Sequence, residues 1–284
     1  MPEISPAARL PDPSQSLRRQ ALDVLCLTDA RDKANAARAL FRGVAQADTG
    51  HLGTDDHIDA GLALIIPGRP LRPELVPPQQ VERRRSLHTD AGRAALIHAL
   101  CHIEFNAINL ALDAVWRFSG MPADYYRDWL RVADEEAFHF TLLADHLGTL
   151  GFRYGDFPAH NSLWEMCDRT AGDVLARMAL VPRTLEARGL DASPPVRAKL
   201  ASAGDHAAAA IIDIILRDEV GHVAIGNRWY RWLCTQRGLD PVSTYATLAQ
   251  QHRAPKLRGP FNLDARRAAG FDEDELAWLE ASAG

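Results

Sequence analysis

The sequence predicts an all-α protein with a bundle of four long helices at its centre. Between residues 90 and 238, long stretches that favour helix are separated by short segments in which glycine and proline end them. No stretch alternates apolar and polar residues in the manner of a half-buried strand. Two copies of the pattern E-x-x-H also fall within these stretches, where helical spacing places Glu and His on one face. We therefore expect helices packed on helices.

Two kinds of structure are expected before the bundle. Residues 16–47 are rich in Ala, Leu and Arg, which predicts one or two amphipathic helices. Residues 61–89 have five prolines between Pro67 and Pro78, and proline lacks the backbone donor that a helix needs, so this segment predicts an extended strap. We expect one structural domain made of N-terminal helices and strap (residues 1–89), bundle (90–238), and C-terminal loop with a short helix (239–284).

Capping and helix-breaking residues set the expected bounds of the helices. Asp90 can cap the first bundle helix, and Gly151 can close the second. Gly189 and the pair Pro194-Pro195 are expected to stop the third. After a basic loop that contains prolines, Asp272 is the candidate cap of a short terminal helix. The predicted bundle helices cover residues 91–118, 123–150, 163–188 and 203–234.

Composition and charge restrict the class of protein. The 32 Lys and Arg against 37 Asp and Glu give a formal charge of −5, with no general basic excess for nucleic acid, although a local basic patch is compatible with this total. The four cysteines lie far apart, which argues against a disulfide scaffold or a structural zinc site. The N-terminus lacks the apolar run of an export signal, and the longest apolar runs, at 61–67 and at 207–216 where Asp213 interrupts, are too short to cross a bilayer. We expect a cytoplasmic protein without a membrane partner.

The two E-x-x-H copies carry the candidate chemistry. Glu136 and His139 lie on the second predicted helix, and Glu219 and His222 on the fourth. An offset of three residues is a rotation of about 300°, so each Glu and its His project from the same face about one turn apart. Each copy can therefore hold one metal ion with a carboxylate and an imidazole.

A lone glutamate precedes each copy at nearly the same distance. Glu104 lies 136 − 104 = 32 residues before Glu136, and Glu186 lies 219 − 186 = 33 residues before Glu219. In the first hairpin Glu104 and Glu136 are at a similar depth from the turn. Glu186 fits less well, because its predicted helix ends just after it. Four carboxylates and two imidazoles in apolar surroundings suit two ferrous ions, with a manganese–iron pair as the alternative.

An acidic residue stands directly before each E-x-x-H copy. Histidines that bind a metal usually donate their other ring N–H to a carboxylate. We assign Asp218 and Glu135 to this supporting role, each serving the histidine of the opposite copy, with a solvated acid as the alternative. Four other residues are set aside: His98 and His102 as packing or surface histidines, His146 as a histidine at the core edge, and Tyr230 as a packing residue.

Several stretches of the chain resemble one family as a set: GRAALIHALCHIEFNAINLALDAVWRF, DWLRVADEEAFHFTLLADHLGTLG, LVPRTLEARGLDASP, ILRDEVGHVAIGNRWY and PKLRGPFNLDARRAAGF. They resemble the ferritin-like superfamily of di-iron carboxylate proteins, and within it an uncharacterised bacterial branch similar to the di-iron tRNA hydroxylase. The resemblance implies a ferritin-like bundle with the six ligands named above. It also implies an oxidoreductase that activates O2 to hydroxylate or oxidise an organic substrate, either a small molecule or a modified nucleoside.

Two other classes of function stay open. One is a ferroxidase, peroxidase or iron-handling protein without an organic substrate, and the other is a non-catalytic bundle that a metal stabilises. The long additions on both sides of the bundle favour an enzyme, because storage proteins of this type have little beyond the bundle. The electron donor is not indicated, and a homodimer is compatible with the sequence.

Overall fold

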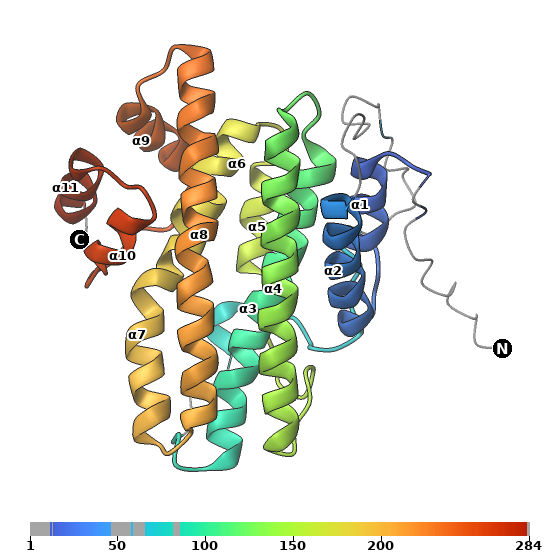
Figure 1. Ribbon diagram of the computed structural model, residues 1–284. Coiled ribbons are helices and arrows are strands. Elements are labelled where there is room, and N and C mark those ends of the chain that lie inside the picture. Colours follow the sequence, from blue (N-terminus) through green and yellow to red (C-terminus); the bar gives the residue numbers. More distant parts are fainter. Residues whose placement is uncertain (1–11, 13, 47–57, 59–65, 82–85, 283–284) are drawn as a thin grey trace. The chain divides into compact units, whose positions relative to one another are not determined.

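A computed structural model of the chain describes residues 12, 14–46, 58, 66–81 and 86–282 (Figure 1). Within these ranges the regular secondary structure is helical, with an isolated bridge between Leu75 and Ala159 and no strand. The all-α prediction is confirmed. The chain forms two compact units, residues 1–84 with 94–160 and residues 85–93 with 161–284, and each is described by itself. The layout expected from the sequence, with one domain overall, stays a prediction.

Among its described residues, the first unit contains the short helix α1 and three long helices, and the sequence predicts their positions closely. The predicted segments 91–118 and 123–150 agree with the observed helices to within one residue at each end, and two helices lie within residues 17–46. The predicted cap Asp90 is wrong, because Asp90 is the first residue of the helix and the Thr89 hydroxyl accepts from the N–H of Gly92 at 3.1 Å. Helix α2 packs along α4, and α1 packs against α2. The bounds are α1 Leu17–Leu25, α2 Ala30–Gln46, α3 Asp90–Arg117, of which residues 94–117 belong to this unit, and α4 Ala123–Thr149.

Two tyrosines at the start of α4 fix the hairpin between α3 and α4. The Tyr125 hydroxyl donates to the carbonyl of Ala114 at 3.3 Å, and the Tyr126 hydroxyl donates to the carbonyl of Phe118 at 2.9 Å. These bonds satisfy carbonyls at the C-terminal end of α3, where the helix supplies no donors of its own. These bonds fix the register of the two helices at the turn that joins them.

The described part of the strap, residues 66–81, is irregular, and its attachment depends on Gly68. The ammonium group of Lys33, a fully buried residue of α2, donates to the carbonyl of Gly68 at 2.6 Å. The Gly68 N–H donates to Leu25 at 3.0 Å, and a Cβ atom at position 68 would lie 2.1 Å from the carbonyl oxygen of Cys26. Only glycine fits this approach. A short 3₁₀ turn, η1 (Pro78–Gln80), follows.

The second unit contains the long helix α8 with α7 packed along it (Figure 1). The prediction of a single, continuous helix over residues 163–188, the third of the bundle, is wrong in two ways. The chain breaks after α5, where the carboxylate of Asp173 accepts from the N–H of Leu175 and caps α6, and it continues as helix well past Gly189. The bounds are α5 Ser162–Arg169, α6 Val174–Leu180, η2 Val181–Glu186, α7 Ala187–Ser202 and α8 His206–Arg237.

Helix α7 continues through Pro194 and Pro195, which the sequence expectation took as its end. A proline inside a helix has no N–H for the carbonyl four residues earlier, so Pro194 deprives Leu190 of its intrahelical donor. Here the side-chain amide of Asn262 donates to that carbonyl at 3.2 Å. A residue 72 positions away therefore supplies what the local sequence lacks, and the helix is maintained.

The segment η2 is a π-helix, and it carries Glu186 as its last residue. Pro182 has no N–H to donate to the carbonyl four residues earlier, which favours a local shift to the wider i→i−5 pattern. The Thr184 hydroxyl accordingly donates to the carbonyl of Ala179, five residues back, at 2.8 Å. Helix α8 comes very close to this segment at Gly226, where a Cβ atom would lie 2.5 Å from Cβ of Pro182.

The C-terminal extension is more helical than expected. The predicted cap of the terminal helix is confirmed, since the carboxylate of Asp272 accepts from the N–H of Glu275 at 2.9 Å. Two helices before it were missed, because the prolines and basic residues of this region favoured a loop. The bounds are α9 Pro241–Gln251, α10 Leu263–Ala268 and α11 Glu273–Ser282.

Helix α3 is long and apolar enough, by length and composition, to cross a membrane. The expectation drawn from the sequence considered only the longest runs of apolar residues, so it did not include α3. In the structure 78% of its most apolar window is buried within the protein, as in the core helix of a folded domain. Length and hydropathy alone do not separate that case from a spanning helix.

Candidate metal centre

Three predicted ligands meet in the first unit, and we call them the first half-site: Glu104 on α3 and Glu136 and His139 on α4. Atom Nδ1 of His139 lies 3.3 Å from Oε2 of Glu104 and 3.4 Å from Oε2 of Glu136. Their solvent exposures are 4%, 0% and 0%, so the group is closed to bulk water in the structure. One ligand atom from each residue lies within 4.8 Å of the others, so the group could hold a metal ion.

The electrostatics of the first half-site favour a cation. The pKa of Glu104 is raised to about 8, chiefly by burial and also by the nearby carboxylate of Glu136, while the hydrogen bond and charge of His139 act in the opposite direction. A carboxylate whose ionised form is disfavoured by burial and by a second carboxylate gains most from an additional positive charge. The two carboxylates therefore give the site an excess of negative charge, which a divalent cation would balance.

The distances in the first half-site also suit a shared ion. With metal–ligand bonds of about 2.1 Å, neighbouring donor atoms lie about 3.0 to 3.4 Å apart in octahedral or tetrahedral coordination. The two distances from His139 Nδ1, 3.3 and 3.4 Å, fall within that range. Two carboxylates with one imidazole form a donor set of the type that iron and manganese accept. The residues present fit such an ion.

The other three predicted ligands lie in the second unit, and we call them the second half-site: Glu186 at the end of η2, and Glu219 and His222 on α8. Oε1 of Glu219 lies 3.9 Å from Nδ1 of His222, and the two residues are 7% and 0% exposed. Oxygen Oε2 of Glu186 is also buried. One turn after Glu186, a Cβ atom at Gly189 would lie 4.0 Å from the Glu219 carboxylate, so α7 runs directly beside that ligand.

The placement of Glu186 removes the difficulty that the sequence raised. Its predicted position near a helix end is wrong, because η2 passes directly into α7 and the helical path continues to Ser202. Glu186 therefore stands between two helical segments rather than at a frayed terminus. Its role as a ligand stays a prediction, as do the roles of the other five residues.

The two acids assigned to a supporting role have other neighbours in the structure. Asp218 accepts from Nε of the exposed Arg217 at 2.8 Å, and Glu135 accepts from Nε of Arg131, one turn earlier, at 2.9 Å. The side chains of the two acids are 14% and 23% exposed. Whether they also orient the histidines stays a prediction.

Beside the first half-site, His98 and His102 pack around Tyr154, a residue that sequence reasoning missed. His98 stacks on the Tyr154 ring with centroids 5.4 Å apart, and Nδ1 of His102 lies 2.8 Å from the Tyr154 hydroxyl. Both histidines are buried, at 1% and 7% exposure, so they are packing rather than surface residues. Tyr154 follows α4 in an irregular loop, so no helical period indicated its direction.

The burial of His98 predicts a loss of stability in acid. Burial lowers the pKa of His98 to about 4 from the usual 6.5, and its Nε2 accepts from the N–H of Gly155 at 2.9 Å. Because the unfolded chain takes up a proton near pH 6.5 and the folded protein does so only near pH 4, stability falls as pH drops between these values. We expect a loss of about 2 kcal/mol between pH 7 and pH 5 from this residue.

Urea unfolding at pH 7 and pH 5 measures the contribution of His98 to the pH dependence of the free energy of unfolding. His98→Gln keeps a hydrogen-bond acceptor but cannot titrate, so its pH dependence should be smaller by about 2 kcal/mol than that of the wild type. Equal pH dependence in the two proteins would show that His98 is protonated without penalty in the folded state.

A family model and a curated relative match the chain. The model of the family described as protein of unknown function (DUF455) matches residues 26–277. An uncharacterized protein of Haemophilus influenzae is 52% identical over 217 residues, which cover 74% of this chain and 75% of that protein. No solved structure matches the chain significantly. The family match extends over both half-sites.

Proposed function

This chain belongs to the DUF455 family, whose description states no activity, and from its two half-sites we propose that it is a di-metal oxidoreductase that activates O2. The first half-site would hold one ion and the second half-site the other, with iron as the favoured metal and a manganese–iron pair as the alternative. The bundle would then be ferritin-like. An organic substrate, either a small molecule or a modified nucleoside, would be hydroxylated or oxidised.

The observation that carries the proposal is the repetition of one ligand arrangement. Each half-site has a glutamate from one helical segment and a Glu-x-x-His pair from the next long helix in the same unit. Di-iron carboxylate proteins with ferritin-like bundles use the same inventory, one Glu from each of two helices and Glu-x-x-His from each of two others. Chance could supply one copy, whereas two copies, with five of their six residues buried, support a common purpose.

The side chains determine what such a centre could do. Two ferrous ions, when bound, supply electrons for the reduction of O2. The four carboxylates balance the four positive charges, which favours burial of the loaded site. His139 and His222 are fully buried, so their rings are held by packing, and exclusion of water strengthens every charge interaction within the site.

Oxidation of an organic substrate is favoured here over iron handling. The chain has helices α1 and α2 before the ligand-bearing helices and α9 to α11 after them. A protein that only oxidises and releases iron needs a path for the ion, and it has less need for such additional structure. This difference supports an enzyme with a substrate to enclose.

The proposal is tested by the reaction of the ferrous protein with O2. Metal-free protein is loaded anaerobically with about two Fe²⁺ per chain and mixed with O2-saturated buffer while absorbance is recorded by stopped flow. We expect rapid consumption of O2 and a transient absorbance band, whose decay becomes faster with candidate substrates. The paired variant Asp213→Ala/His206→Ala, which removes an exposed acid and an exposed histidine from α8, should behave as the wild type does.

Two results would contradict this function. Steady accumulation of a ferric mineral would indicate iron handling instead. If Fe²⁺ is oxidised no faster than in the same buffer without protein, the proposal that the protein activates O2 is wrong.

A further inference from the structure

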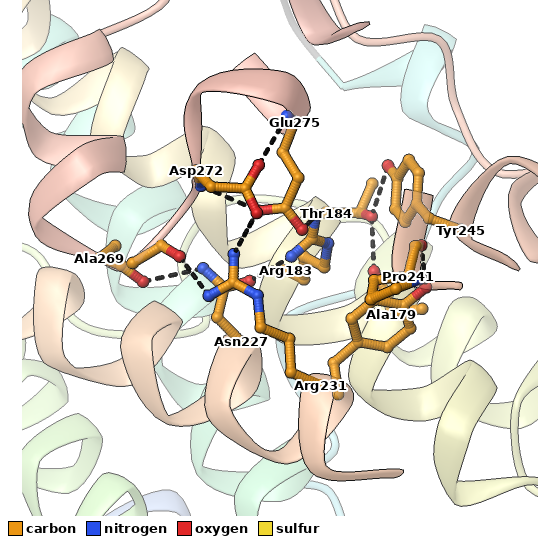
Figure 2. A network of polar contacts seen from close by, with 12 residues as sticks. Ala179, Arg183, Thr184, Asn227, Arg231, Pro241, Tyr245, Ala269, Asp272 and Glu275 are labelled. Atoms are coloured by element: carbon orange, nitrogen blue, oxygen red, sulfur yellow. Dashed lines mark hydrogen bonds and ion pairs between the residues drawn. The ribbon is translucent and has the colours of Figure 1, made fainter. Parts of the chain in front are cut away.

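Arg183 stands in the π-helix η2, three residues before Glu186, and its side chain is 4% exposed (Figure 2). Its Nη1 donates to Oδ1 of Asn227 on α8 at 2.8 Å, and its Nη2 donates to Oε1 of Glu275 on α11 at 2.6 Å. The guanidinium also lies 4.6 Å from the ring centre of Phe271. An arginine of the π-helix is thus held by residues of the C-terminal extension.

Glu275 is fixed by further contacts. Its Oε2 accepts from the N–H of Asp272 at 3.0 Å, while the Asp272 carboxylate accepts from the N–H of Glu275. This reciprocal pair is a capping box, which fixes the start of α11. Arg231 of α8 forms a second ion pair with Glu275 (Figure 2). Glu275 therefore links the start of α11, the π-helix and α8.

The extension also holds the chain on the other side of Glu186. Arg266 of α10 donates to the carbonyl of Ala187 at 3.3 Å and pairs with Oδ2 of Asp191 at 2.6 Å. Asn262 donates to the carbonyl of Leu190, which Pro194 leaves without its helical donor. Contacts from one segment, residues 262–275, thus bracket Glu186 at Arg183 before it and at Ala187 and Leu190 after it.

We infer that the C-terminal extension positions Glu186 for metal binding, with Arg183 and Arg266 as positioning residues. This inference rests on the proposed metal centre. A π-helical turn is less stable than α-helix and contains one extra residue. Loss of that extra residue from the turn would rotate Glu186 by about 100° about the helix axis. The contacts at Arg183, before Glu186, and those at Ala187 and Leu190, after it, prevent this change, because they fix the backbone on both sides of the extra residue.

The test uses Glu275→Gln in the full-length chain. The substitution keeps the shape of the side chain but removes the charge that pairs with Arg183 and Arg231. Metal-free protein is titrated with Co²⁺, whose visible absorption bands report each site, and unfolding in urea is measured in parallel. We expect one ion to bind as in the wild type and the second to bind about tenfold more weakly or worse, with altered bands.

Glu273→Gln, on the same helix as Glu275, is the matched control. Glu273 of α11 accepts from the exposed Arg267 of α10 at 2.7 Å, so Glu273→Gln removes an ion pair of α11 that joins it to α10 and not to η2. Its titration should equal that of the wild type. A purely structural role for Glu275 would lower the free energy of unfolding but leave both Co²⁺ affinities unchanged.

The outcomes separate this inference from the proposed function. Failure of the wild type to bind Co²⁺ would overturn the metal centre and this inference together. Two unchanged Co²⁺ affinities in Glu275→Gln would overturn this inference alone. If Glu275→Gln does not fold, Asn262→Ser decides, because serine still caps α10 but cannot reach the Leu190 carbonyl. Weaker binding of the second ion in that variant supports the inference, and unchanged binding overturns it.

Discussion

The double variant Glu219→Ala/His222→Ala is expected to lose about half of the metal content of the protein while keeping its helical structure. Wild-type protein produced with iron should carry about two ions per chain, and the variant about one. Two of three donors of the second half-site disappear, so that half-site should no longer hold an ion, while the first half-site keeps all three of its donors. Iron is measured by plasma emission spectrometry and helix content by far-ultraviolet circular dichroism.

Retention of the fold follows from the positions of the two residues. Glu219 and His222 are buried on α8, and their replacement by alanine removes polar groups without interrupting the helix, since alanine has the highest helix propensity. The exposed pair Asp213→Ala/His206→Ala on the same helix controls for loss of an acid and a histidine. Full metal content in Glu219→Ala/His222→Ala would refute the assignment of the second half-site.

Gly226→Ala is expected to reduce both stability and metal binding. A Cβ atom at position 226 would lie 2.5 Å from Cβ and 2.7 Å from Cγ of Pro182, and a proline ring cannot rotate away. The π-helix and α8 must therefore separate. The clash costs about 1–3 kcal/mol, and removal of a helical glycine returns about 0.5–1 kcal/mol. We expect a net loss of about 1–2 kcal/mol in the free energy of unfolding.

The effect on metal arises because Pro182 precedes Glu186 by four residues in the same π-helix. A displaced π-helix carries Glu186 away from Glu219, so the second ion should bind more weakly. Urea unfolding and metal titration measure the two effects. Gly43→Ala in α2, where a Cβ atom would meet nothing within 4 Å, is the matched control and should be slightly stabilising. Equal stability of Gly226→Ala and wild type would show that the two helices separate without cost.

Helices α3 and α4 were predictable because their signals are local. Asp90 begins α3, the turn with Gly120 separates the two helices, and α4 ends just before Gly151. The E-x-x-H pairs were predictable for the same reason, since a three-residue offset has one outcome on a helix. Proximity of Glu104 to Glu136 and His139 followed from equal depth in a hairpin. Short-range rules were sufficient for this part of the molecule.

The path around Glu186 was not predictable, because distant residues decide it. Pro194 reads as a helix end unless Asn262 is known to supply its missing hydrogen bond. Pro182 in the middle of a predicted helix was the available signal for the π-helix, and it was overlooked. Nothing near Arg183 in the sequence indicates Glu275, which lies 92 residues later. Tertiary contacts override local propensity at each of these positions.

The hydrogen bond from Asn262 to the Leu190 carbonyl also restricts the order in which substitutions at positions 194 and 262 can occur in this family. Leu190 is fully buried, so a change at Asn262 while Pro194 remains would leave a polar oxygen without a donor in the core. Replacement of Pro194 by another residue restores a donor within the helix, after which position 262 can vary. The proline must therefore be lost before the asparagine, and lineages that keep Pro194 should keep a side-chain donor at position 262.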